Sequence, residues 1–158
     1  MIRKLSEKDY KEVKELVYQV HKLHYLNRAD IYTDENPLSL EYFTKIVNDP
    51  ATIAYVYVNG CKIYGLLIAT KKSNRLVPNF RNRTIYFIED IVVDRNYRRR
   101  GIGKSLYCLL KEKAEKEGID AIELNVWGFN KDAIKFYESL GMSVKNIKYE
   151  QLMKNHQN

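Results

Sequence analysis

The sequence predicts an α/β (α+β) fold in which helices cover a mixed β-sheet. Its 158 residues, 45% hydrophobic and 30% charged, fit one globular domain spanning residues 1–158. This length is enough to bury a core without disulfides or metal. Helical and strand periodicities also alternate along the chain in an order that combines hairpins with crossover connections, and this order is typical of a mixed sheet.

The first fifty residues predict a short strand followed by two helices. Residues 2–5 form the strand, and Ser6 with Asp9 makes a variant of the capping box that favours a helix start. Apolar side chains follow at helical spacing and define one buried stripe. Residues 27–36 are polar and irregular, and Pro37 is suited to begin the second helix.

The middle of the chain is rich in β-branched and aromatic residues and predicts three strands. Residues 51–58 and 61–70 are joined by Asn-Gly at 59–60, a strong type I′ hairpin signal. The basic stretch 71–83 contains a proline and is typical of a loop. Residues 84–93 form the third long strand.

Helices and strands alternate in the last third. Residues 101–117 predict a helix that Gly118 ends, and residues 119–127 predict a strand. Residues 130–140 predict another helix. The remainder, 142–154, is typical of one or two closing strands.

Charge and cysteine usage limit the class of protein. Lysine and arginine number 27 against 20 acidic residues, a net charge of +7, which attracts polyanions such as nucleic acid, an anionic membrane or a phosphorylated cofactor. No apolar run approaches the length of a membrane span. Cys61 and Cys108 lack zinc spacing and stand in apolar contexts, so we expect reduced residues in or near the core. Together with a charged N-terminus that lacks a signal-peptide core, this predicts a cytoplasmic protein.

One segment carries a phosphate-binding pattern. A strand ends in a basic loop that contains Arg98, and Gly101 and Gly103 open the next helix. Glycines let a ligand approach the backbone, and the first N–H groups of a helix are free to bind an anion. The pattern is neither a Walker P-loop nor the three-glycine dinucleotide motif. On its own, a solvated basic turn remains an alternative.

Two spaced motifs resemble those of the GNAT family of N-acetyltransferases. Residues 88–104 are similar to motif A through Arg98-x-x-Gly101-x-Gly103, and residues 125–142 resemble motif B. The resemblance covers nearly all of the chain. It implies a mostly antiparallel sheet of about six to seven strands, splayed between the fourth and fifth, and about four flanking helices.

The resemblance also implies acetyl-CoA as a cosubstrate. Its diphosphate would bind the main-chain amides from Arg99 to Lys104, its pantetheine arm would follow a free strand edge, and Asn130 would contact the arm from the other side. Convergent N–H donors and an unpaired edge suit these groups. The residues assigned to the cosubstrate are Ile91, Val92, Val93, Arg98, Arg99, Arg100, Gly101, Ile102, Gly103, Lys104 and Asn130.

Acetyl transfer to an amine needs a base and an acid, because an alkyl amine has a pKa near 10.4. Glu89 is the candidate base, with an ion-paired or solvated carboxylate as the alternative. Asp90 would face the opposite side in a regular strand, but a bulge would change this, and it is a candidate contact for a cationic substrate. Tyr137 matches the motif B tyrosine that commonly acts as an acid, and the alternative is a core tyrosine. Tyr32 falls where the family builds its acceptor pocket.

The expected function is therefore transfer of acetyl from acetyl-CoA to a primary amine by direct attack in a ternary complex. Similarity to the diamine branch favours a polyamine or another small amine. A protein N-terminal or lysine acetyltransferase and a basic nucleic-acid-binding module are the alternatives. We expect an amine-bearing molecule or peptide as partner, no membrane partner and no resident metal. Nucleic acid is disfavoured, and a homodimer is compatible with the resemblance.

Overall fold

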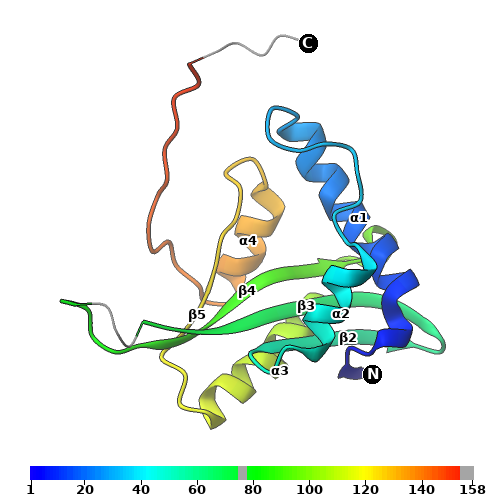
Figure 1. Cartoon of the computed structure of the whole chain (residues 1–158), viewed down its shortest axis with the longest axis horizontal. Helices are drawn as coiled ribbons and strands as arrows, with labels where there is room; N and C mark the ends of the chain where they lie inside the picture. The colour runs from blue at the N-terminus through cyan, green and yellow to red at the C-terminus, as the bar shows by residue number, and fades with distance from the viewer. Residues whose placement is uncertain (75–77, 154–158) are drawn as a thin grey trace.

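A five-stranded sheet organises the chain in the computed structural model, which describes residues 1–74 and 78–153 (Figure 1). The strand order is β1-β2-β3-β4-β5; adjacent strands from β1 to β4 are antiparallel, and β5 is parallel to β4. The expected mixed, mostly antiparallel sheet is confirmed, with five strands in the described residues where six to seven were expected. Their bounds are β1 Ile2–Lys4, β2 Thr52–Asn59, β3 Lys62–Ser73, β4 Thr84–Val93 and β5 Ala121–Leu124.

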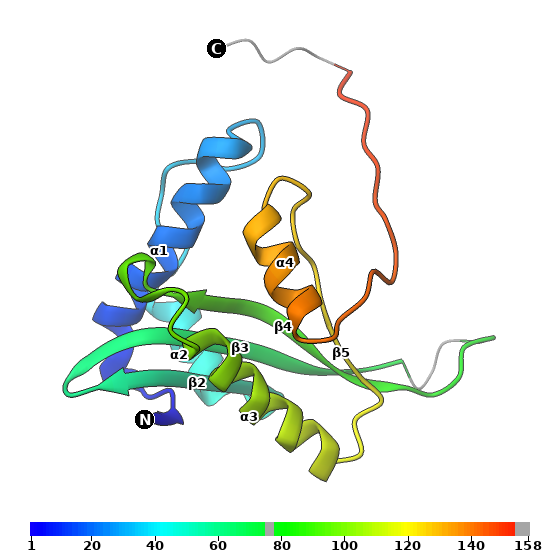
Figure 2. The same ribbon diagram turned by 180° about the vertical axis from the view of Figure 1, so that it is seen from behind.

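Helices cover both faces of the sheet, as Figures 1 and 2 show from opposite sides. On one side lie α1 and α2, and on the other lies α3; α4 stands beside the end of β4. None of the described helices combines the length and apolar character needed to cross a bilayer. The helical bounds are η1 Glu7–Asp9, α1 Tyr10–Asn27, α2 Leu40–Asn48, η2 Arg95–Tyr97, α3 Ile102–Lys116 and α4 Lys131–Ser139.

Capping residues set where the first helices begin. The predicted capping box forms, and the Ser6 amide donates to the Asp9 carboxylate at 2.9 Å. The second helix begins at Leu40 rather than at Pro37, because the hydroxyl of Ser39 accepts a hydrogen bond from a first-turn amide and caps the helix there.

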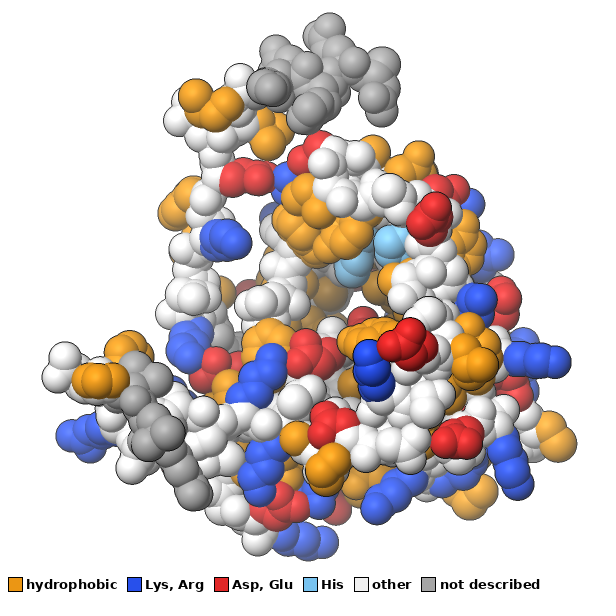
Figure 3. All heavy atoms as spheres, in the orientation of Figure 1, with side chains coloured by type: hydrophobic (Ala, Val, Ile, Leu, Met, Phe, Trp, Pro, Cys, Tyr) orange, Lys and Arg blue, Asp and Glu red, His pale blue; other side chains and the backbone are white. Residues whose placement is uncertain are grey.

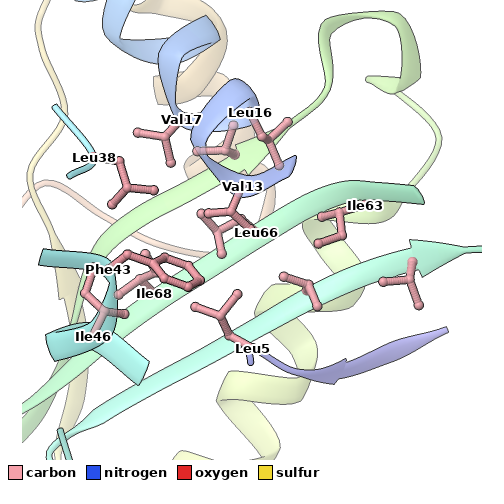
Figure 4. Close-up of a cluster of buried hydrophobic side chains, with 13 residues drawn as sticks. Leu5, Val13, Leu16, Val17, Leu38, Phe43, Ile46, Ile63, Leu66 and Ile68 are labelled. Carbon is pink, nitrogen blue, oxygen red and sulfur yellow. The ribbon is translucent and has the colours of Figure 1, made fainter. Parts of the chain in front are cut away.

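Alternation along β3 supplies two hydrophobic cores. Leu66 and Ile68 pack against α1 and α2, whereas Leu67 and Ala69 pack against α3. Figure 4 shows the first core, where Phe43 of α2 lies beside Ile68. Both faces of the sheet are therefore buried under helices. A site can instead form at the loops that follow the end of β4.

Two local predictions are wrong. Cys61 and Cys108 are both exposed, since Cys61 lies in the β2–β3 turn and Cys108 lies on the helix face away from the buried Leu106 and Leu110. The hairpin itself is confirmed, but its turn is not type I′, because Gly60 alone among the turn residues has a positive φ.

The predicted closing strands are also wrong for residues 142–153, and Lys154 lies outside the described residues. After Gly141, whose φ is +87°, the chain leaves the sheet and forms no helix or strand up to residue 153. We call residues 142–153 the C-terminal arm. A strand requires a hydrogen-bonding partner, and no described strand pairs with this segment.

Candidate active site

A cleft of about 970 Å³ opens at the end of β4, between α1 and α2 on one side and α4 on the other. It exists because β4 pairs with β5 only as far as Ile88, so residues 89–93 have no partner strand on that side. This is the expected splay between the fourth and fifth strands. The space-filling view shows the hollow on this face, with histidine side chains at its margin (Figure 3).

The predicted site residues converge on this cleft, with one exception. Arg100 does not line it, and its guanidinium instead lies 4.8 Å from the centre of the Tyr97 ring. The sequence-predicted residues that line the cleft are Tyr32, Glu89, Asp90, Ile91, Val92, Val93, Arg98, Arg99, Gly101, Ile102, Gly103, Lys104, Asn130 and Tyr137.

The turn before α3 presents free main-chain donors to the cleft. Arg99 and Gly101 both have left-handed φ angles, +60° and +79°. Ser105 is the first residue of α3 whose amide donates to a backbone carbonyl, that of Gly101 at 2.9 Å. Within the described chain, the amides of residues 99–104 donate to no other backbone group. The helix dipole adds positive potential there, so the turn fits a diphosphate.

Close packing holds this turn against α4. A Cβ atom at Gly103 would lie 3.1 Å from the Phe136 ring and 3.5 Å from Val93. The side chain of Arg98 also donates to the Val93 carbonyl at 3.2 Å. These contacts fix the loop between β4 and α3. The first turn of α3 also contains no acidic residue that would repel an anion.

A β-bulge at Glu89 decides where the two carboxylates of β4 point. Ile68 of β3 pairs with Asp90 and the next residue, Ala69, pairs with Ile88, so Glu89 is the extra residue. The burial of two nearby residues supports the bulge. Ile88 packs with α3 while Val92 packs with α1 and α2, although side chains four residues apart lie on the same face of a regular strand. As a result, Glu89 and Asp90 both line the cleft instead of facing opposite sides.

The two carboxylates have different environments. Glu89 is exposed and forms an ion pair with Lys72 at 2.9 Å, which is the alternative that the sequence left open. Asp90 has no ion pair or hydrogen bond within the described residues. Burial, and secondarily the charge of Glu89, raise the pKa of Asp90 from 3.8 to about 6. A carboxylate enclosed in this way favours a cationic ligand beside it.

Tyr137 lines the same cleft from α4. Burial raises its pKa well above the usual value of 10, and the negative charge of Asp90 raises it further. The phenol is therefore protonated at neutral pH and has a proton to donate. Asn130 caps α4 by accepting from the Ala133 amide at 3.2 Å, and its side-chain NH2 group donates no hydrogen bond within the described chain.

An aromatic cluster that the sequence did not predict stands at the far wall of the cleft, which its members His24, Tyr32 and Trp127 line. The ring of Tyr32 stacks on His24 at 5.5 Å, and its hydroxyl accepts a hydrogen bond of 3.1 Å from the Trp127 indole. Phe129 stacks on Trp127 at 5.9 Å. Trp127 also lines the cleft, so it is part of the pocket wall.

Other cleft residues were missed as well. His21 and His24 received no site role from the sequence, yet both line the cleft, as does Tyr42 of α2. Burial and the neighbouring His21 lower the pKa of His24. In the sequence, the one indication of a shared role was the three-residue spacing of His21 and His24 on the apolar face of α1. The third histidine of the sequence, His156, lies outside the described residues.

Comparisons with known proteins identify the family of the chain. The model of the acetyltransferase (GNAT) family matches residues 17–142. The chain is 30% identical to thialysine N-epsilon-acetyltransferase of Mus musculus over 89% of this chain and 74% of that protein. It is 39% identical to L-ornithine N5-acetyltransferase NATA1 of Arabidopsis thaliana over 42% of this chain. A solved mutant of the BH1408 protein from Bacillus halodurans has a TM-score of 0.94 at 31% identity, covering 98% of this chain and 99% of that one.

Several curated relatives match over only part of their length. The matched stretch spans 29% of the Arabidopsis protein and 31% of an uncharacterized N-acetyltransferase from Methanocaldococcus jannaschii.

Proposed function

Because this chain belongs to the acetyltransferase (GNAT) family and is an acyltransferase, we propose that it acetylates a small amine that carries no carboxylate, with acetyl-CoA as donor. The observation that carries the proposal is the charge distribution along the cleft. The cosubstrate end presents free amides and basic side chains, whereas the acceptor end presents two carboxylates. Nucleic-acid binding is not needed to explain this arrangement.

The cosubstrate end supports binding of acetyl-CoA. The amides of residues 99–104 and the side chains of Arg98 and Lys104 would hold the diphosphate, and the unpaired edge of residues 91–93 would bind the pantetheine amides. Acetyl-CoA supplies an activated thioester, whose acyl carbon accepts the amine. The family's use of this donor supports the same assignment.

The reacting groups follow from the positions of Asp90, Glu89 and Tyr137. The amine nitrogen forms the new C–N bond while the C–S bond breaks, directly and within a ternary complex. The amine proton goes to the pair of carboxylates formed by Glu89 and Asp90, which both line the cleft. Burial raises the pKa of Asp90. The leaving thiolate takes the proton of Tyr137. An amide near Ile91 would stabilise the charge on the carbonyl oxygen.

The lining of the acceptor end favours an amine over an amino acid. The described residues that line it from α1, α2, β3 and β4, and from the segment between α1 and α2, include no lysine or arginine. Arg28, whose guanidinium lies over the ring of Trp127, is engaged by Asp30 and Glu150 at 2.7 Å each. The cation beside the two carboxylates, Lys72, is already engaged by Glu89 at 2.9 Å. A substrate carboxylate would therefore lie near Glu89 and Asp90 without a counter-charge of its own, at a cost in binding free energy. Diamines and polyamines avoid this cost.

Matched pairs of acceptors test the proposal. We expect kcat/KM for CoA release to be at least about tenfold higher with cadaverine than with lysine. The same difference should separate putrescine from ornithine. A tenfold ratio corresponds to about 1.4 kcal/mol of binding free energy. Each pair differs only by the carboxylate. Faster turnover of the amino acids, or of peptide N-termini, would contradict the assignment and favour the ornithine-type or the protein-type relatives.

The pH dependence of the rate should report Asp90. Because the carboxylate must be ionised to accept a proton, we expect kcat/KM to rise with a midpoint near pH 6. Asp90→Asn should remove this limb. Glu89→Gln should shift it to lower pH, since the Glu89 charge contributes to the raised pKa of Asp90. A limb that persists in Asp90→Asn would exclude Asp90 as the group that titrates.

Asp90→Asn should also stabilise the fold. The pKa of Asp90 in the folded chain lies above its unfolded value, so ionisation of Asp90 lowers the stability of the fold. This loss grows as the pH rises from about 4 to about 6 and is complete above pH 6. At pH 7 the variant should gain roughly 2–3 kcal/mol in free energy of unfolding. Thermal melting of both proteins at pH 4 and pH 7 checks this result. Equal melting temperatures at pH 7 would contradict it.

A further inference from the structure

A lysine of the chain places its ammonium group at the margin of the acceptor end. The ammonium of Lys72, on β3, lies 2.9 Å from the Glu89 carboxylate and 3.9 Å from the centre of the Phe87 ring. Glu89 lines the cleft, whereas Lys72 and Phe87 stand just outside its lining. A carboxylate and an aromatic ring at the edge of the cleft therefore hold one primary ammonium between them.

Two tyrosines show the order of the carboxylates along the cleft. Burial, and then the charge of Asp90, raise the pKa of Tyr137, the proposed acid. Burial, and then the charges of both carboxylates, raise the pKa of Tyr42 on α2. Asp90 therefore stands beside the reacting groups, and Glu89 lies further out, where Lys72 contacts it. An acceptor whose reacting nitrogen lies at Asp90 would have its far end near Glu89.

The chemistry of Lys72 indicates which group fits beside Glu89. A lysine side chain is an alkyl chain that ends in a primary ammonium, and so is each end of a diamine. A carboxylate and an aromatic face stabilise such a cation by charge-assisted hydrogen bonding and by cation–π attraction. The stem of Lys72 is flexible and 46% exposed, so its ammonium can move into solvent without any change of the backbone.

We propose that Glu89 and Phe87 form a subsite for the second ammonium of a diamine or polyamine, and that Lys72 occupies this subsite until the acceptor displaces it. The inference rests on the proposed function and divides the work of the carboxylates, since Asp90 takes the reacting amine and Glu89 the far end. Exchange of one ammonium for another keeps Glu89 paired. An acceptor without a second ammonium leaves Lys72 in place, so Lys72 sets how strongly the site prefers diamines to monoamines.

Calorimetric titration of the CoA-loaded chain with cadaverine and with pentylamine tests the proposal. The two probes have the same length and differ by one ammonium, and CoA without an acetyl group permits binding but no turnover. Lys72→Met removes the competing cation. It should lower the Kd of cadaverine relative to that of pentylamine by about two- to fivefold, the range expected for one partly exposed ion pair.

Lys71→Met is the matched control. Lys71 is the preceding residue of β3, and its side chain points to the other face of the sheet, where it pairs with Glu117 at 3.1 Å. The control removes the same charge from the same strand and should leave the ratio of the two Kd values unchanged. Adding Glu89→Gln to Lys72→Met should abolish the gain for cadaverine, because the subsite then lacks its carboxylate.

The outcomes separate this subsite from the proposed function. An unchanged ratio in Lys72→Met would overturn the subsite, as would an equal gain in Lys71→Met or a gain that survives Glu89→Gln. The function is judged by release of CoA from acetyl-CoA with the matched acceptor pairs. Turnover of amines together with an unchanged ratio rejects the subsite alone, whereas absence of turnover with every amine rejects the function.

Discussion

Replacing Tyr137 with phenylalanine should lower kcat by about 10²- to 10⁴-fold, the usual contribution of a positioned acid. The substitution removes one oxygen from a side chain that already lines the cleft, so the affinity for acetyl-CoA should change little. Steady-state kinetics and calorimetric titration with acetyl-CoA separate the two effects. Because the pKa of Tyr137 lies well above 10, the loss should be nearly constant from pH 6 to pH 9.

Tyr107→Phe is the matched control for this variant. Tyr107 is buried, and burial also raises its pKa, but it does not line the cleft. The control should keep the wild-type kcat. If Tyr137→Phe retained the same kcat as this control, the phenol of Tyr137 would not be the proton donor to the thiolate, and water would have to supply that proton.

Gly101→Asp should weaken acetyl-CoA binding by about 100- to 1,000-fold. The new carboxylate would stand among the amides that we assign to the diphosphate, and two like charges about 4 Å apart repel by ~4 kcal/mol at an effective dielectric constant of 20. Calorimetric titration measures the effect. Gly101→Asn places a neutral side chain of the same shape at this position and should weaken binding much less.

Gly118→Asp separates loss of binding from backbone strain. Gly118 also has a left-handed φ, +63°, and a Cβ there, as at Gly101, would have no atom within 4 Å. Both aspartate variants should therefore lose a similar amount of stability, but Gly118→Asp should bind acetyl-CoA normally because it lies past the far end of α3. Equal losses of affinity in the two variants would contradict a diphosphate site at Gly101.

Local patterns predicted much of the framework. The run of β-branched and aromatic residues gives β4 its bounds at Thr84 and Val93, and the glycines at 101 and 103 mark the start of α3. The alternating pattern of the arm predicted a strand as well. It could not reveal that no described strand pairs with the arm, because pairing is a tertiary property.

The cleft depends on features that local patterns do not encode. The bulge at Glu89 follows from how β3 pairs with β4, and one extra residue changes the side to which Asp90 points. The cluster of His24, Tyr32, Trp127 and Phe129 joins segments about a hundred residues apart in the sequence. Each ring alone is compatible with an ordinary core position, so the acceptor wall emerges only from the fold.

The proposed function depends on binding of the diphosphate of acetyl-CoA by the amides between Arg99 and Lys104. Amide NMR spectra of the isotope-labelled chain, titrated with CoA and separately with pantetheine, test it most directly. CoA should shift the amide resonances of residues 99–104 strongly, whereas pantetheine, which lacks the diphosphate, should shift those of residues 91–93 and leave the turn unchanged. If CoA saturates the protein while the resonances of residues 99–104 stay in place, the diphosphate binds elsewhere and the turn before α3 is not its site.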